Sequence, residues 1–204
     1  MKINTEMAKY ALQNNLHVEL FVWCYLKSLR NDGCHDISVL DQPKFLKSSF
    51  QRKLVDNPFF SVANGKIYVK SLKNLPCNLG LRNFICDISE LNKFPRKKSH
   101  SSDRTIKEWN STTIKYLMIC VVACQYKDEK PYALKLISED TGCSITIIQR
   151  ALKNLFVDRW LNIQTKSTMR SYYQDKKQVN LSPNYYNFLL GKYFVKQYYF
   201  VRII

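Results

Sequence analysis

Residues 136–155, LISEDTGCSITIIQRALKNL, constrain the fold more than any other part of the sequence. Gly142 follows a short helical stretch and suits a turn in which φ must be positive. Ser144 is a favourable N-cap for the helix that comes next. That helix carries apolar residues at helical spacing, at Ile148, Leu152 and Leu155. The segment therefore predicts two helices held across each other by a tight turn.

Further predicted elements flank this segment in the second half of the chain. Residues 112–125 form an apolar helical run, and the two helices of the segment itself cover 132–140 and 144–156. Residues 160–165 are predicted to form a strand, and residues 178–181 are predicted to form the strand that pairs with it. The order is helix, helix, turn, helix and then a β-hairpin.

The first half of the chain repeats this order. Its predicted helices cover residues 17–30, 37–41 (or a restart at 44–47) and 48–55. Two strands follow, at 60–62 and 66–70, and Asn64-Gly65 between them is a strong hairpin signal.

The two halves align at an offset of about 98 residues. Residues 50–54, FQRKL, fall on residues 148–152, IQRAL, and the helix around Phe21 falls on the helix around Ile119. Because each half has the element order of a winged helix, the predicted class is α+β. It is mainly α with small β-hairpins, arranged as two tandem winged helix-turn-helix domains.

The predicted domains are residues 9–75 and residues 108–182. A basic linker at 92–107, NKFPRKKSHSSDRTIK, joins them and is too polar to bury a core. The remaining segment, 183–204, is rich in aromatic residues. We expect it to pack on a module as a helix or strand; a homodimer contact is the alternative.

Charge narrows the class of partner. The chain has 32 Lys plus Arg against 16 Asp plus Glu, a formal net charge of +16. Such an excess attracts polyanions, of which nucleic acid is the commonest and an anionic membrane surface the second. The longest apolar run, 117–124, is too short to span a bilayer. We therefore expect a nucleic-acid partner and no membrane association.

Cysteine usage and the lack of catalytic motifs exclude several other classes. The seven Cys include no CxxC pair, and Cys24, Cys120 and Cys124 lie in apolar helical runs, which favours a reducing, cytoplasmic location. The spacing of Cys34-His35, Cys77 and Cys86 matches no common zinc pattern. No phosphate-binding loop or nucleophile elbow occurs. We therefore expect that the protein is not an enzyme and that it binds no metal, cofactor or small-molecule ligand.

Residues 142–155 resemble the recognition segment of the GntR-type winged-helix regulators, whose pattern is roughly G-V-S-R-x-T-V-R-x-A-L-x-x-L. The agreement lies at Gly142, Ser144, Ile148, Ala151, Leu152 and Leu155, and Arg150 lies beside a basic position of the pattern. The resemblance implies a helix that enters the major groove with its N-terminal residues toward base edges. Three positions depart from the pattern: Ile145 replaces a DNA-contacting Arg, Ile147 replaces Thr, and Gln149 replaces a basic residue. Each of these isoleucines is expected either to touch a thymine methyl or to be packed.

The candidate DNA contacts fall into four groups. The third helix of the second half offers Ser144, Thr146, Gln149, Arg150 and Lys153, with Gln suited to adenine and Arg to guanine. The second wing, a long basic tip at 166–177, offers Lys166, Arg170, Lys176 and Lys177. The first half offers Gln51, Arg52, Lys53 and Lys66. The linker offers Arg96, Lys97 and Lys98.

The predicted function is binding of double-stranded DNA, as a transcription regulator or a replication initiator. The layout looks like that of the tandem-winged-helix initiators of plasmids and phages, and equally like a compact regulator of a mobile element. The alternative is an interaction adaptor whose winged helices dock an acidic protein partner.

Overall fold

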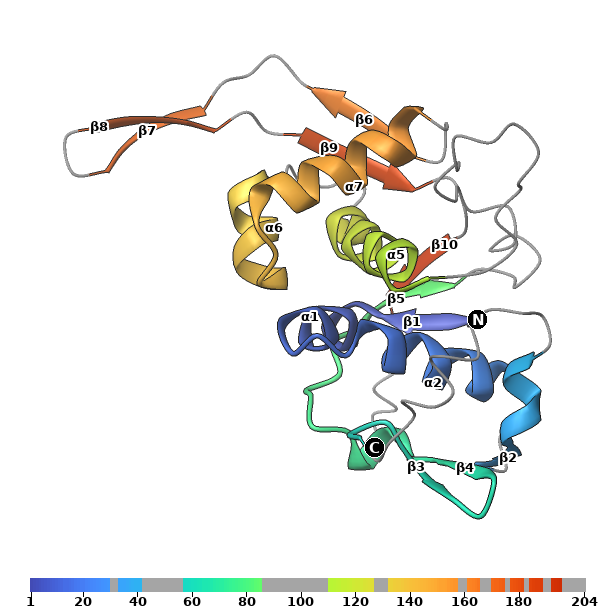
Figure 1. Cartoon of the computed structure of the whole chain (residues 1–204). Helices are drawn as coiled ribbons and strands as arrows, with labels where there is room; N and C mark the ends of the chain where they lie inside the picture. The colour runs from blue at the N-terminus through green and yellow to red at the C-terminus, as the bar shows by residue number, and fades with distance from the viewer. Residues whose placement is uncertain are drawn as a thin grey trace, which may run out of the picture.

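The computed structural model has an α+β fold with five described α-helices and small antiparallel sheets (Figure 1). The described residues are 1–29, 33–41, 57–85, 110–126, 132–157, 161–165, 170–174, 177–181, 184–188 and 192–195. None of the helices in these ranges combines the length and apolar character needed to cross a bilayer.

The chain begins with a strand and a helix that the sequence analysis did not predict. Strand β1 (Lys2–Asn4) leads directly into α1 (Thr5–Gln13). Asn4 caps this helix, since its Oδ1 accepts hydrogen bonds from the backbone nitrogens of Glu6 and Met7 at 3.0 and 3.3 Å. The apolar residues of α1 are buried along one face: Met7, Ala8, Ala11 and Leu12. The predicted domain that starts at residue 9 therefore begins inside α1.

Two apolar helices form the centre of the molecule, and both were predicted. They are α2 (His17–Leu29) and α5 (Ser111–Ala123), which continues as the 3-10 turn η3 (Cys124–Tyr126). Both helices contact α1 and each other. Helix α2 belongs to the first half of the chain and α5 to the second. Because the buried residues of both helices belong to one hydrophobic cluster, the two halves share one continuous core.

The first half carries a small three-stranded sheet of order β2-β4-β3. Strand β2 (Cys34–Asp36) follows α2, the 3-10 helix η1 (Ile37–Asp41) comes next, and β3 (Phe60–Ala63) and β4 (Lys66–Val69) form the hairpin. Asn64 and Gly65 both have positive φ, 51° and 69°, as the twist of a two-residue hairpin requires. The short helix and the hairpin are confirmed; the helix predicted at 48–55 lies outside the described residues.

The second half contains the two helices predicted across a turn. Helix α6 (Leu134–Thr141) starts two residues later than expected, and α7 (Ile145–Val157) starts directly after Ser144. Gly142 between them adopts φ 65°, ψ 9°, the left-handed conformation expected at this position.

The strand pairing that follows α7 differs from the prediction. Strand β6 (Leu161–Thr165) pairs with β9 (Asn184–Phe188), whereas β8 (Lys177–Leu181), the expected return strand, pairs with β7 (Arg170–Gln174). In the predicted basic tip at 166–177, residues 170–174 and 177 therefore belong to a β-ribbon, and the other residues of the tip lie outside the described part of the chain. The ribbon of β7 and β8 extends away from the helices (Figure 1).

A further three-stranded sheet joins strands near the two ends of the chain to a strand from its middle. Its order is β1-β5-β10, in which β5 (Arg82–Ile85) lies in the centre and β10 (Lys192–Val195) comes from the aromatic C-terminal segment. Arg82 also donates from Nη1 to the backbone oxygen of Gln125 at 2.7 Å, and its guanidinium lies 5.3 Å from the ring centre of Tyr126. Strand β5 thus connects the first half to η3 of the second.

Candidate nucleic-acid interface

The turn between α6 and α7 is fixed by hydrogen bonds within a few residues of sequence. The backbone nitrogen of Gly142 donates to the oxygen of Ser138 at 2.9 Å, and Ser138 Oγ donates to the oxygen of Cys143 at 2.7 Å. Thr141 Oγ1 donates to the oxygen of Ile137 at 2.6 Å and accepts from the nitrogen of Cys143 at 3.3 Å. These hydrogen bonds satisfy polar groups of the turn and restrain its backbone.

Helix α7 separates its two faces sharply. Ile148 and Leu152 are buried in the core, as their spacing predicted, and Ala151 is buried with them. The burial of Leu155, the third predicted position, lies outside the described residues. All five candidate DNA contacts of this segment are exposed: Ser144, which precedes the helix, and Thr146, Gln149, Arg150 and Lys153 on the face of the helix away from the core. Ser144 Oγ also accepts from the backbone nitrogen of Ile147 at 3.4 Å, which confirms Ser144 at the start of the helix.

The two isoleucines in the first turn of α7 have different environments. Ile147 is partly buried and packs against the core. Ile145 is 43% exposed, one of the most exposed large apolar residues in the described part of the chain. Of the two alternatives left open by the sequence, packing thus applies to Ile147 but not to Ile145.

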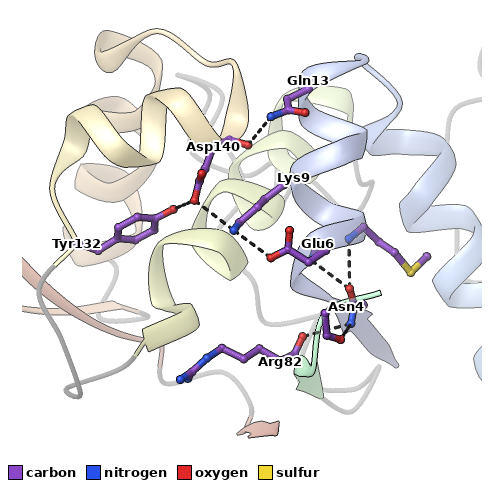
Figure 2. Close-up of polar contacts among 9 residues, drawn as sticks. Asn4, Glu6, Lys9, Gln13, Arg82, Tyr132 and Asp140 are labelled. Atoms are coloured by element: carbon purple, nitrogen blue, oxygen red, sulfur yellow. Dashed lines mark hydrogen bonds and ion pairs between the residues drawn. The ribbon is translucent and has the colours of Figure 1, made fainter. Parts of the chain in front are cut away.

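Helix α1 holds the turn from the side, through contacts that join residues far apart in sequence (Figure 2). Lys9 Nζ lies 3.2 Å from Asp140 Oδ2 and 3.0 Å from Glu6 Oε1. The side chain of Gln13 donates from Nε2 to the backbone oxygen of Asp140 at 3.0 Å, and Tyr132 Oη donates to Asp140 Oδ2. The helix pair is therefore attached to the N-terminal helix, a contact that no local sequence pattern signalled.

Burial, hydrogen bonds and charges in this cluster shift the pKa of two groups. Burial lowers the pKa of the Lys9 ammonium, but hydrogen bonds to Glu6 and Asp140 and the charges of these carboxylates outweigh burial and raise it overall. Burial raises the pKa of the Tyr132 hydroxyl, and the hydrogen bond to Asp140 and the charge of Asp140 raise it further. Lys9 is thus held charged and Tyr132 neutral over the physiological pH range.

The candidate contacts outside α7 are only partly placed. Lys66 is exposed at the start of β4, directly after the hairpin turn. Arg170 lies in β7 and Lys177 in β8, on the two strands of the extended ribbon. The other eight candidates lie outside the described residues: Gln51, Arg52, Lys53, Arg96, Lys97, Lys98, Lys166 and Lys176.

Four of the cysteines in the described part of the chain are buried core residues: Cys24, Cys120, Cys124 and Cys143. Cys24, Cys120 and Cys124 are buried as expected, and burial raises the pKa of the Cys120 and Cys124 thiols well above the usual value. Within the described ranges no group of His, Cys, Asp and Glu side chains is arranged to hold a metal ion.

A hollow of about 570 Å³ lies in the first half, away from α7. Residues of β1, α2 and β5 line it, among them Lys2, Trp23 and Ile85. It shares no lining residue with α6 or α7, so the exposed face of α7 is a separate surface.

Comparison with models of known protein families, with curated proteins and with solved structures gave no match. Function must therefore be inferred from the geometry of the chain itself.

Proposed function

We propose that this protein binds double-stranded DNA and places α7 in the major groove. The observation that carries the proposal is the combination of an α6–turn–α7 unit held by hydrogen bonds with an exposed α7 face made of hydroxyl, amide and basic side chains. Ser144 and Thr146 lie at the N-terminal end of this face, and Gln149, Arg150 and Lys153 lie further along. A helix-turn-helix presents the N-terminal residues of its second helix to base edges, in a groove about 12 Å wide.

The elements around α7 support this reading. Strand β6 follows α7 in sequence, contacts it and pairs with β9, as a strand of the wing does in a winged helix. The β7–β8 ribbon lies between β6 and β9 in sequence. The ribbon carries Arg170 and Lys177. Together with the net charge of +16, these elements suit contacts with the phosphate backbone on either side of the groove.

The first half supports a second winged-helix module. Strand β2 follows α2 and pairs with β4, the last strand of the hairpin, while β3 pairs with the other side of β4. Helix α2, strand β2, helix η1 and this hairpin succeed each other in winged-helix order. We therefore propose two tandem modules, fused through the shared core of α1, α2 and α5.

Fluorescence anisotropy with a labelled random-sequence duplex over a salt series tests DNA binding. The wild-type chain is expected to bind, and its log affinity is expected to fall linearly and steeply with log salt concentration. The double variant Gln149→Ala/Arg150→Ala is expected to bind at least tenfold more weakly, since it loses a phosphate- or base-contacting charge and an amide.

A matched control removes the same types of group elsewhere. Lys73 and Asn74 are adjacent exposed residues in the 3-10 helix η2 (Leu72–Asn74) of the first half. Lys73→Ala/Asn74→Ala makes the same change in net charge and is expected to retain nearly wild-type affinity. Equal losses in both double variants would mean that net charge, and not α7, controls binding. No binding at low salt would refute the proposal and favour an adaptor that docks an acidic protein.

For the biological role we propose a transcription regulator or a replication initiator of a mobile element. The two roles differ in what they do to bound DNA. An initiator is expected to bind direct repeats and melt adjacent AT-rich sequence, whereas a regulator leaves the duplex paired. Permanganate reactivity of thymines beside a selected site distinguishes them, because permanganate attacks unpaired thymine.

A further inference from the structure

We propose that Ile145 makes α7 a reader of thymine, through contact with the 5-methyl group in the major groove. This inference rests on the proposed DNA binding and goes beyond it, because it names the chemical feature of DNA that the first turn of α7 recognises. The class of target is a site with an A·T base pair whose thymine methyl faces the N-terminal end of α7.

The first turn of α7 presents apolar atoms where a base reader usually presents charge. Ile145 is 43% exposed, and Thr146 beside it is exposed as well. In the described part of the chain the exposed basic residues of this helix begin only at Arg150, more than one turn later. A branched aliphatic side chain and the Thr methyl are suited to contact the methyl group of thymine, which is the only apolar group on the major-groove edge of the bases.

The spacing to Gln149 strengthens the assignment. Ile145 and Gln149 are four residues apart and both exposed, so they lie on one side of the helix, about 6 Å apart along its axis. That rise is less than two base-pair steps of about 3.4 Å each. Gln pairs with adenine through its N6 and N7 positions. An adenine read by Gln149 and a thymine methyl touched by Ile145 therefore fit the same or neighbouring A·T pairs.

The core does not account for the exposure of Ile145. Its neighbour Ile147 fills the packing position in the first turn, and Ile148 is fully buried. Lone exposed apolar residues are common on protein surfaces, so exposure alone does not indicate a contact with DNA. The place of the residue in the helix-turn-helix distinguishes a residue that can contact bases from one that cannot. Leu136, which is 45% exposed, provides the comparison, because it lies on α6 rather than α7. In a helix-turn-helix the first helix crosses the backbone and does not face base edges.

Replacing thymine by 2′-deoxyuridine tests the contact, since the two nucleotides differ only in the 5-methyl group. A site is first selected with the wild-type chain from a random duplex library, and its thymines are then replaced one at a time. At the contacted position the affinity of the wild-type chain is expected to fall about fourfold, as expected for the loss of one buried methyl. Ile145→Ala is expected to bind both duplexes with equal affinity, and Leu136→Ala is expected to keep the wild-type ratio.

Each possible result of these measurements either supports or overturns the contact between Ile145 and thymine. Equal wild-type affinity for thymine and deoxyuridine at every position, or a selected site without thymine, would overturn the thymine contact and leave DNA binding intact. A ratio preserved in Ile145→Ala would assign the contact to another residue and overturn the inference. Absence of any binding would overturn DNA binding as well. The wild-type comparison does not depend on how well the variants fold.

Discussion

His17 makes the stability of the fold depend on pH in a way that can be calculated. It is the first residue of α2 and is buried, with Nε2 2.9 Å from Ser111 Oγ at the start of α5. Its Nδ1 has no hydrogen-bond partner among the described residues. Burial and, to a smaller extent, the charge of Lys115 lower the pKa of the imidazole from 6.5 to about 4, while the hydrogen bond with Ser111 opposes the shift.

The direction of the effect follows from proton binding. Because the pKa of His17 is lower in the folded chain, the unfolded chain binds the proton more tightly, and acid favours unfolding. Above about pH 7 the group is neutral in both states and has no effect. As the pH falls from 6.5 toward 4, the free energy of unfolding decreases. At pH 5 the loss caused by His17 is about 2 kcal/mol, and it is complete below pH 4.

Urea unfolding of the wild-type chain and of His17→Gln at pH 8 and pH 5 measures this effect. Gln is neutral at both values and can donate to Ser111 Oγ, so it keeps the hydrogen bond and removes the titration. Carboxylates that titrate in the same range are common to both proteins and cancel in the comparison. We expect the wild-type chain to lose about 2 kcal/mol more than His17→Gln between the two values. Equal losses in the two proteins would refute a buried neutral His17.

Two further predictions concern the turn and its attachment to α1. Gly142→Ala is expected to destabilise the fold by about 1–2 kcal/mol in urea unfolding, because Ala is strained in the left-handed conformation. An added Cβ would meet its nearest neighbour, an atom of Gln13, at an ordinary 3.5 Å. Gly65→Ala should therefore cost a similar amount, and a much larger loss in Gly142→Ala would reveal a steric cause. In a double-mutant cycle Lys9→Met and Asp140→Asn are expected to couple by about 1 kcal/mol; additive losses would show that the ion pair contributes nothing.

Several elements could be predicted from sequence because their causes are local. The predicted helices α2, α5, α6 and α7 have apolar residues at helical spacing, and α7 has Ser144 before its first turn. Asn64-Gly65 and Gly142 adopt the positive φ that few other residues tolerate. The exposed and buried faces of α7 follow from the same periodicity. Helix α1 was missed although it carried a signal, namely Asn4 as a cap before a Met, Ala and Leu stripe.

Strand partners were decided by the tertiary structure. The stretch after α7 contains several short strands of similar pattern, and local alternation does not say which of them pair. The prediction joined β6 to β8, whereas the fold pairs β6 with β9 and β7 with β8. Strand β5 finds its partners near the two ends of the chain, β1 and β10, which no local pattern encodes.

The sequence by itself determined the turns at Asn64-Gly65 and Gly142, the four helices α2, α5, α6 and α7, and which face of α7 stays in water. These features depend on backbone sterics and on apolar spacing within a few residues. Only the tertiary structure decided that the two halves share one core, that Lys9 and Gln13 of α1 hold the α6–α7 turn, and that Ile145 remains exposed while Ile147 is packed. Those outcomes depend on which distant surfaces bury each other, and burial is a property of the assembled chain rather than of any segment in it.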